Sequence, residues 1–263
     1  MSEIRDQCIW ITGAGSGIGQ ALVRLLVAQN NFLIISGRGS EQLLEVQKLC
    51  PQRIRLLPCD VGNDEDMQRA KSELESLTDQ LDLVIACAGT CEYEDDLRLD
   101  TASYRRVFDS NFFGVVNTLR TALPLLNHRA AGKTPPVFAA VGSLSSVVGM
   151  PRAEAYGASK AALGYFLDAV RADTARVPLR IVEIRPGFID TPLTASNDFS
   201  MPFLMTPEKA AQRILAGLSS GARTIDFPRR LSWPLRLMGC MQSLWFGLVA
   251  PRLTRIHQLR HRI

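Results

Sequence analysis

The segment CIWITGAGSGIGQALVRLLVAQ, residues 8–29, contains three structural signals in succession. Cys8–Thr12 is a short apolar run typical of a buried strand, and a glycine-rich turn follows it directly. From Gly17 onward the apolar side chains recur at helical spacing. Glycines in such a turn let the backbone approach a pyrophosphate, and the helix start directs its free N–H groups and positive dipole end toward that charge. The segment therefore predicts a dinucleotide cradle, with a glycine-rich turn that binds nothing as the alternative.

The rest of the chain repeats this alternation of strand and helix. Apolar strand-like runs occur at residues 32–36, 54–61, 81–89, 136–143 and 179–187, and helical patterns occur at 41–49, 64–77, 101–131, 155–175 and 206–218. Near-continuous apolar strands that alternate with helices are typical of a parallel sheet covered on both faces. We predict an α/β fold, a doubly wound parallel sheet of about seven strands, in one domain over residues 1–230. Residues 231–263 are predicted to be a helical extension of the same domain.

Composition excludes several functional classes. The 263 residues are 46% hydrophobic and 21% charged, as in ordinary soluble globular proteins, and no signal peptide is expected at the start. The six cysteines form no CxxC pair, so we expect reduced thiols in a cytoplasmic protein. His257 and His261 are four residues apart, as zinc ligands can be, but a solvated basic helix explains them better because no acidic or cysteine partner is near. We expect neither a metal site nor a nucleic-acid partner.

The end of the second predicted strand bears on cofactor choice. Enzymes that prefer NAD place an acid there to bind the ribose hydroxyls. The sequence here reads IISGRGS, with no acid at Ser36 or Gly37 and with Arg38 following. A guanidinium suits a 2′-phosphate, which favours NADP, although a solvated loop arginine is the alternative. Asp60, at the end of the third strand, could accept a hydrogen bond from an adenine amine or simply begin a helix.

The stretch AYGASKAAL, residues 155–163, places Tyr156 four residues before Lys160. Residues at this spacing share one helix face, and a nearby ammonium lowers the pKa of a phenol. Such a pair is a tuned proton donor and acceptor. Ser143 lies thirteen residues upstream at a strand end, where it could hydrogen-bond a substrate oxygen. A core tyrosine with a surface lysine is the alternative for the pair alone.

Together these motifs resemble the short-chain dehydrogenase/reductase family over about residues 8–191. The glycine motif matches Thr12–Gly19, and the catalytic serine, tyrosine and lysine match Ser143, Tyr156 and Lys160. The resemblance implies that Asn111 holds the lysine through water. It also implies a Rossmann-type domain with the following cofactor contacts: Gly13, Gly15, Ser16, Gly17, Ile18, Gly19, Arg38, Asp60, Val61, Ala88, Gly89, Tyr156, Lys160, Pro186, Gly187, Ile189 and Thr191.

Three departures from the family pattern stand out. Cys87 occupies a position where asparagine is common, and Ser145 and Ser146 compete with Ser143, which its spacing to the tyrosine favours. The glycine-rich final strand segment of many family members is absent, and the sequence TIDFPRR stands there instead.

The implied reaction is hydride transfer between NADP(H), less favourably NAD(H), and a carbonyl or alcohol substrate. Tyr156 is then the general acid/base, and a non-catalytic NADP-binding sensor or scaffold is the rival reading. The apolar residues of Leu193–Met205 follow the Pro-Gly motif, where the family has its lid, and favour a hydrophobic substrate. The family also uses the helices at 101–131 and 155–175 as a shared interface, which predicts a homodimer or homotetramer.

The C-terminal tail differs in charge from the body. Residues 223–263 contain eight arginines and one aspartate, +7, whereas the whole chain carries +4, so the first 222 residues sum to −3. The 14 uncharged residues Leu237–Ala250 are too few for a bilayer span of about 20. As one helix they would have a wide apolar face, with Arg229, Arg230, Arg252, Arg255, Arg260 and Arg262 flanking the stretch. This pattern allows peripheral contact with the inner membrane surface, as in a lipid-carbonyl reductase, but closure of the substrate pocket or a subunit contact is the favoured alternative.

Overall fold

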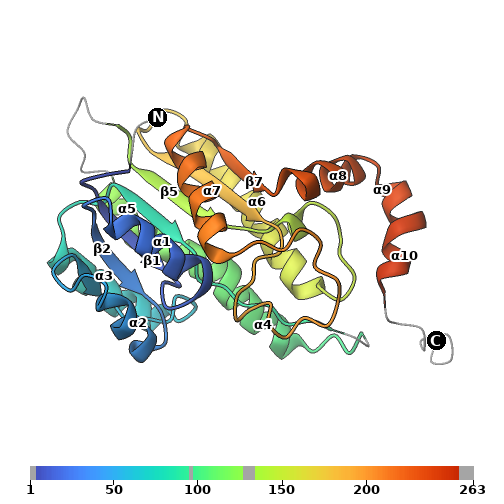
Figure 1. The fold of residues 1–263 in the computed structure, drawn as a ribbon, viewed down its shortest axis with the longest axis horizontal. Coiled ribbons are helices and arrows are strands. Elements are labelled where there is room, and N and C mark those ends of the chain that lie inside the picture. The colour runs from blue at the N-terminus through green and yellow to red at the C-terminus, as the bar shows by residue number, and fades with distance from the viewer. Residues whose placement is uncertain (1–3, 95–96, 127–133, 255–263) are drawn as a thin grey trace.

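The computed structural model describes residues 4–94, 97–126 and 134–254. Its centre is a seven-stranded parallel sheet in the order β3-β2-β1-β4-β5-β6-β7 (Figure 1). The strands are β1 (Cys8–Thr12), β2 (Phe32–Ser36), β3 (Ile54–Leu56), β4 (Leu83–Ala86), β5 (Val137–Val141), β6 (Arg180–Pro186) and β7 (Thr224–Phe227). The strand order reverses between β1 and β4, and in doubly wound sheets this switch point is where ligands bind. The predicted α/β doubly wound, Rossmann-type fold is confirmed.

Helices cover both faces of the sheet. They are α1 (Gly17–Val27), α2 (Ser40–Gln47), α3 (Asp64–Leu77), α4 (Thr101–Phe108), α5 (Gly114–Leu126), α6 (Glu154–Asp173) and α7 (Pro207–Ser219). Alternate strand residues point to opposite faces, so Ile9 and Ile11 pack with α1, α2 and α7, whereas Trp10 packs with α3, α5 and α6. All three side chains are fully buried, which explains why β1 is apolar throughout.

The helix expected over residues 101–131 is interrupted. Between α4 and α5, Asp109–Phe113 form a π-helical turn that contains the fully buried Asn111. Single π-turns of this kind are frequent at functional sites because they re-aim one side chain. α5 ends at Leu126, and the last residues of the predicted helix lie outside the described part of the chain.

The final strand forms without the family's glycine-rich segment. Thr224–Phe227 pair in parallel with Glu183–Pro186 of β6, and the alternate residues Ile225 and Phe227 are buried. Alternating burial is sufficient for an edge strand of four residues, so glycine is not required here.

The C-terminal tail is helical as predicted up to Leu253, but residues 237–250 do not form one continuous helix. The chain forms α8 (Arg229–Cys240), α9 (Gln242–Leu244), a π-helical turn (Trp245–Val249) and α10 (Ala250–Leu253), at one end of the molecule beyond β7 (Figure 1). The break occurs at Met241, whose backbone angles of φ −111° and ψ 55° are not helical. Of the expected apolar face, Trp245 is buried whereas Leu237 and Leu248 are exposed. No helix within the described residues is long and apolar enough to cross a membrane. His257, His261, Arg255, Arg260 and Arg262 lie outside those residues.

Candidate active site

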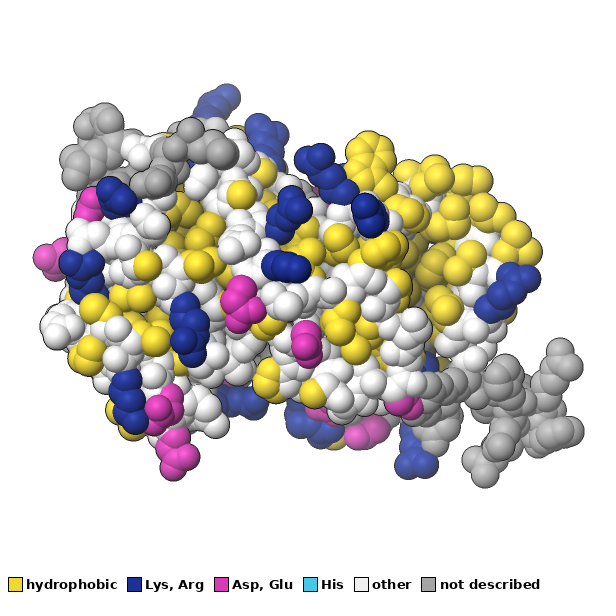
Figure 2. Space-filling model, viewed as in Figure 1, with side chains coloured by type: hydrophobic (Ala, Val, Ile, Leu, Met, Phe, Trp, Pro, Cys, Tyr) yellow, Lys and Arg dark blue, Asp and Glu magenta, His cyan; other side chains and the backbone are white. Residues whose placement is uncertain are grey.

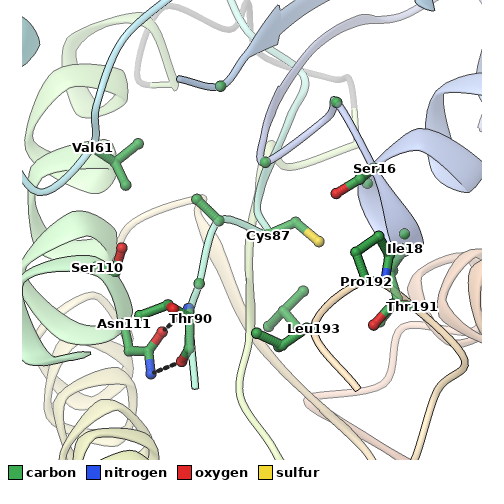
Figure 3. Close-up of a pocket in the computed structure, with 18 of the residues that line it drawn as sticks. Ser16, Ile18, Val61, Cys87, Thr90, Ser110, Asn111, Thr191, Pro192 and Leu193 are labelled. Atoms are coloured by element: carbon green, nitrogen blue, oxygen red, sulfur yellow. Dashed lines mark hydrogen bonds between the residues drawn. The ribbon is translucent and has the colours of Figure 1, made fainter. Parts of the chain in front are cut away.

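A cleft of about 590 Å³ opens where the carboxyl ends of the central strands meet (Figure 3). The loops after β1 to β6 contribute to it, together with the first turn of α1, the π-helical turn and the first two turns of α6. Every residue of the predicted cofactor and catalytic set lines this cleft, with the exception of Ser143. The sequence reading did not single out Gly37, Gly39, Gln42, Cys59, Thr90, Ser110, Val141, Gly142, Pro192 and Thr194, which line it as well.

The glycine turn has no room for a side chain at two of its positions. Gly13 has φ +66°, and a Cβ atom there would lie 2.7 Å from Ala88 Cα. Gly17 has φ +52°, and its Cβ would lie 2.9 Å from Thr191 Cγ2. Ser16 precedes α1 without making a side-chain capping bond, so the N-terminus of the helix faces the cleft (Figure 3). A backbone cradle at the N-terminus of an eleven-residue helix fits the pyrophosphate of a dinucleotide.

The loop after β2 carries the only predicted selector of cofactor type. Arg38 is exposed at the cleft and has no ion-pair partner among the described residues. Asp60, on the loop after β3, accepts a 2.9 Å bond from Gly62 N. A cation without a carboxylate partner is suited to a phosphate ester, because the guanidinium presents planar, charged donors.

Tyr156 stands in the first turn of α6, and its phenol is close enough to the Ser143 side chain for a hydrogen bond to influence its pKa. Burial raises the pKa of Tyr156 to about 12; the bond from Ser143 lowers it in part and Cys91 raises it further. The sequence predicts a lowered pKa for Tyr156, and the structure described gives a raised one because burial dominates. The Lys160 Nζ lies 5.9 Å from the tyrosine ring centroid and donates to Val141 O at 2.8 Å. The phenol is protonated at neutral pH and can act as a proton donor.

Lys160 is itself perturbed by its surroundings. The residue is 3% exposed, and burial lowers its pKa to about 8, while Cys87, Cys91 and Glu183 oppose that change. A buried lysine keeps its charge only with a partner, so a negative charge that forms beside Lys160 would favour its protonated form.

The three serines after β5 have separate roles. Ser143 Oγ accepts hydrogen bonds from Ser145 N at 3.1 Å and from Ser145 Oγ at 2.9 Å. Ser146 Oγ donates to the carbonyl oxygen of Ser143 at 2.7 Å. Ser145 and Ser146 thus both hydrogen-bond Ser143, and the assignment of Ser143 as the catalytic serine stays a prediction.

Asn111 lines the cleft and connects two of the elements that form it. Its side-chain nitrogen donates to Thr90 O at 2.9 Å, and its oxygen accepts from Thr90 N at 2.9 Å (Figure 3). The same nitrogen also donates to Ser159 Oγ at 3.0 Å. These bonds join the loop after β4 to α6. A Cβ atom on Gly89 would lie 2.9 Å from Asn111 Oδ1 and 3.5 Å from Lys160 Nζ, so glycine leaves room between the two side chains. Contact between Asn111 and Lys160 through water stays a prediction.

A cluster around Arg152 holds the predicted substrate segment. Arg152 is 7% exposed, has φ +70°, and contacts Asp198 Oδ1 through both terminal nitrogens at 3.2 Å. Its guanidinium lies 5.7 Å from the ring centroid of Tyr93 and 5.5 Å from that of Phe199. The two rings meet edge to face at 5.4 Å. The cluster thus ties residues 193–205 to the loops after β4 and before α6, and no local sequence signal marked Arg152 or Tyr93.

Cys87 occupies the family's asparagine position and lines the cleft. Burial raises its pKa to about 11, so at neutral pH it is a neutral thiol that packs rather than reacts.

The sequence matches the family model described as short chain dehydrogenase over residues 7–200. It is 31% identical to an uncharacterized oxidoreductase of Myxococcus xanthus, over 96% of this chain and all of that protein. A short chain dehydrogenase from Burkholderia cenocepacia, solved in complex with NADP, superposes with a TM-score of 0.81 at 24% identity, covering 95% of this chain and 100% of that one. A short chain dehydrogenase/reductase from Burkholderia phymatum, solved in complex with NAD, superposes with a TM-score of 0.82 at 17% identity, covering 95% of this chain and 98% of that one. The chain belongs to the short chain dehydrogenase family of oxidoreductases.

Proposed function

We propose that this short chain dehydrogenase transfers a hydride between NADP(H) and a carbonyl or alcohol substrate, with Tyr156 as general acid/base. The observation that carries the proposal is that Tyr156 and the buried Lys160, both on α6, line the same cleft as the glycine cradle. When bound, the nicotinamide supplies or accepts the hydride. The cradle around Gly13 and Gly17 would hold its pyrophosphate, and Pro186 and Thr191 would hold its nicotinamide end.

The protein's own residues then manage the proton. In the reducing direction, Ser143 and Tyr156 hydrogen-bond the substrate oxygen, and the phenol gives its proton to that oxygen as the hydride reaches the carbon. The phenolate left behind is stabilised by the Lys160 ammonium on the same helix face. Asn111 keeps the neighbouring backbone in place through its bonds to Thr90 and Ser159. A non-catalytic sensor would have no use for this set.

We also propose that the cofactor is NADP(H), because Arg38 is exposed at the cleft without an ion-pair partner in the described chain. A relative solved with NADP and another solved with NAD leave this choice to the residues themselves. The apolar Leu193 in the cleft, and Phe199 in the Arg152 cluster, support a hydrophobic substrate.

The quaternary structure we propose is a cytoplasmic homodimer or homotetramer. On the two helices that the family shares between subunits, Tyr165 is 81% exposed and Leu123 is 38% exposed. Large apolar residues on a helix face outside the core are suited to a subunit contact. Light scattering at micromolar concentration tests this, and a monomer would contradict it.

We also propose that residues 1–230 form one catalytic domain and that residues 231–263 are a helical extension of that domain. The packing of Leu235 and Trp245 against the loop after β5 supports that view. A reductase that works at a membrane surface is the second candidate function, which the exposed apolar residues of α8 to α10 favour.

The test of the proposed function is carbonyl-dependent loss of NADPH absorbance over a panel of aldehydes, ketones and quinones. Replacing Tyr156 with Phe should reduce turnover by about a hundredfold or more while NADPH affinity stays unchanged, since the ring remains and the proton is lost. Tyr165→Phe, the same change at an 81% exposed tyrosine of α6, serves as the matched control and should retain far more activity. Turnover of Tyr156→Phe within about tenfold of the wild type would exclude the phenol as the acid.

A further inference from the structure

We infer that α8 to α10 form a surface that binds anionic membranes and brings the active site to apolar substrates dissolved there. The surface consists of six large side chains that are between 45% and 71% exposed: Trp233, Leu237, Met241, Phe246, Leu248 and Leu253. We call this group the C-terminal apolar surface. Figure 2 shows hydrophobic side chains gathered over this end of the molecule. Side chains of this size are exposed so densely only where a surface meets an apolar partner.

The chain segment that carries this surface has charges of one sign. Residues 227–254 contain four arginines and no aspartate or glutamate. Arg229, Arg230 and Arg252 are exposed, and Arg236 lies 3.3 Å from Asp226 Oδ2. That aspartate is already bound by Arg185 at 2.8 Å. Exposed arginines therefore accompany the apolar side chains with no carboxylate from the same segment, so the complementary partner is apolar and negatively charged.

A second copy of the chain does not meet this description. In a two-fold interface the same patch lies on both sides, so the arginines would face arginines with no carboxylate from within the patch. An anionic lipid interface supplies apolar chains and negative headgroups together, and Trp and Phe are favoured at that depth. Since no described helix can span a bilayer, the surface would lie on the membrane.

The same helices contact the catalytic loop on their inner side. Trp245 is 3% exposed, and its indole nitrogen donates to Gly149 O at 2.9 Å. It packs in a separate apolar cluster with Leu144 and Val148, which follow Ser143 directly in the chain. On α8, Leu231 Cδ2 lies 2.8 Å from where a Cβ of Gly187 would be. A membrane bound to the outer side of α8 to α10 would thus lie one helix layer from the loops that line the cleft.

This arrangement adds a substrate class to the proposed function. Of the two parts of the inference, only the substrate class rests on the proposed function. An apolar carbonyl compound dissolved in the bilayer would reach the cleft beside residues 144–150 without crossing bulk water. Membrane binding itself does not depend on catalysis and can be measured separately.

Flotation of the full-length protein tests membrane binding. We expect it to float with vesicles of phosphatidylcholine and phosphatidylglycerol at low salt, and to bind pure phosphatidylcholine vesicles and high-salt samples several-fold less. Leu237→Glu combined with Phe246→Glu should reduce partitioning by about tenfold or more, because each removes an exposed apolar anchor. The matched control is Leu44→Glu, which changes a residue of similar exposure, 48%, on α2. The inference is overturned if the wild type does not float or if the double variant floats as well as the control.

Sedimentation of the same variants separates the membrane from a second copy. If the double variant loses an oligomer while vesicle binding is unchanged, the surface joins subunits and the inference is wrong. Turnover of a short water-soluble aldehyde should be equal in both variants, and turnover of a long-chain aldehyde in vesicles should fall several-fold only in the double variant. If the wild type turns over neither aldehyde, the proposed hydride transfer is refuted, whereas the membrane binding stands on the flotation result.

Discussion

Lys160 should destabilise the fold at neutral pH, and its replacement by Met should reveal this. Burial lowers the pKa of Lys160 from 10.5 to about 8. Because the side chain is almost fully buried, a pKa change of this size corresponds to about 3 kcal/mol of unfolding free energy below pH 8. The variant also loses the 2.8 Å bond to Val141 O, which costs about 1 kcal/mol. We therefore expect Lys160→Met to be about 2 kcal/mol more stable than the wild type at pH 7, although inactive.

The pH dependence distinguishes this cause from better packing. Between the folded pKa near 8 and the unfolded pKa of 10.5, the unfolded chain binds more protons, so the wild type gains stability as pH rises. The penalty falls to about 2 kcal/mol by pH 9, and the stability advantage of Lys160→Met over the wild type should shrink by about 1 kcal/mol. Comparison with the variant cancels other groups that titrate in this range.

Urea unfolding at pH 7, 8 and 9, without added nucleotide, measures these free energies. Lys71→Met, at a half-exposed lysine of α3, is the control and should show no such pH-dependent difference. A difference between Lys160→Met and the wild type that stays constant from pH 7 to 9 would refute the reasoning, because Lys160 would then be charged in the fold at no cost.

Three further outcomes can be checked directly. Arg38→Asp should shift the preference from NADPH toward NADH by about tenfold or more, and a wild type that binds NADH as tightly as NADPH would disprove the assignment. Trp245→Ala should lower the unfolding free energy by about 3 kcal/mol in denaturant titrations, while Trp233→Ala, at 71% exposure, should change it by less than about 0.5 kcal/mol. Asp198→Asn should raise KM several-fold with little change in kcat, because the Arg152 cluster positions residues 193–205. An unchanged KM would show that the Arg152–Asp198 contact does not position this segment for substrate binding.

Local sequence determined the fold class and most of the cleft. The turn after β1 needs glycine because backbone atoms lie where a Cβ would be, and that requirement is visible as a motif. Apolar runs of strand length alternating with helices predicted the doubly wound sheet because parallel strands are buried on both faces. The position of Tyr156 and Lys160 on one helix face likewise follows from their spacing of four residues and from helix geometry.

Only the tertiary structure decided the electrostatics of the site. Sequence spacing placed an ammonium near the phenol, but the pKa of Tyr156 depends on how much water the fold removes, which no neighbour in sequence reports. The π-helical turn at Asn111 and the contacts of Arg152 also arise between residues distant in the chain. In the tail, the apolar pattern predicted one face, whereas the break at Met241 divided it between a buried Trp245 and an exposed surface. Periodicity identifies which residues are apolar, and long-range packing decides which of them are buried.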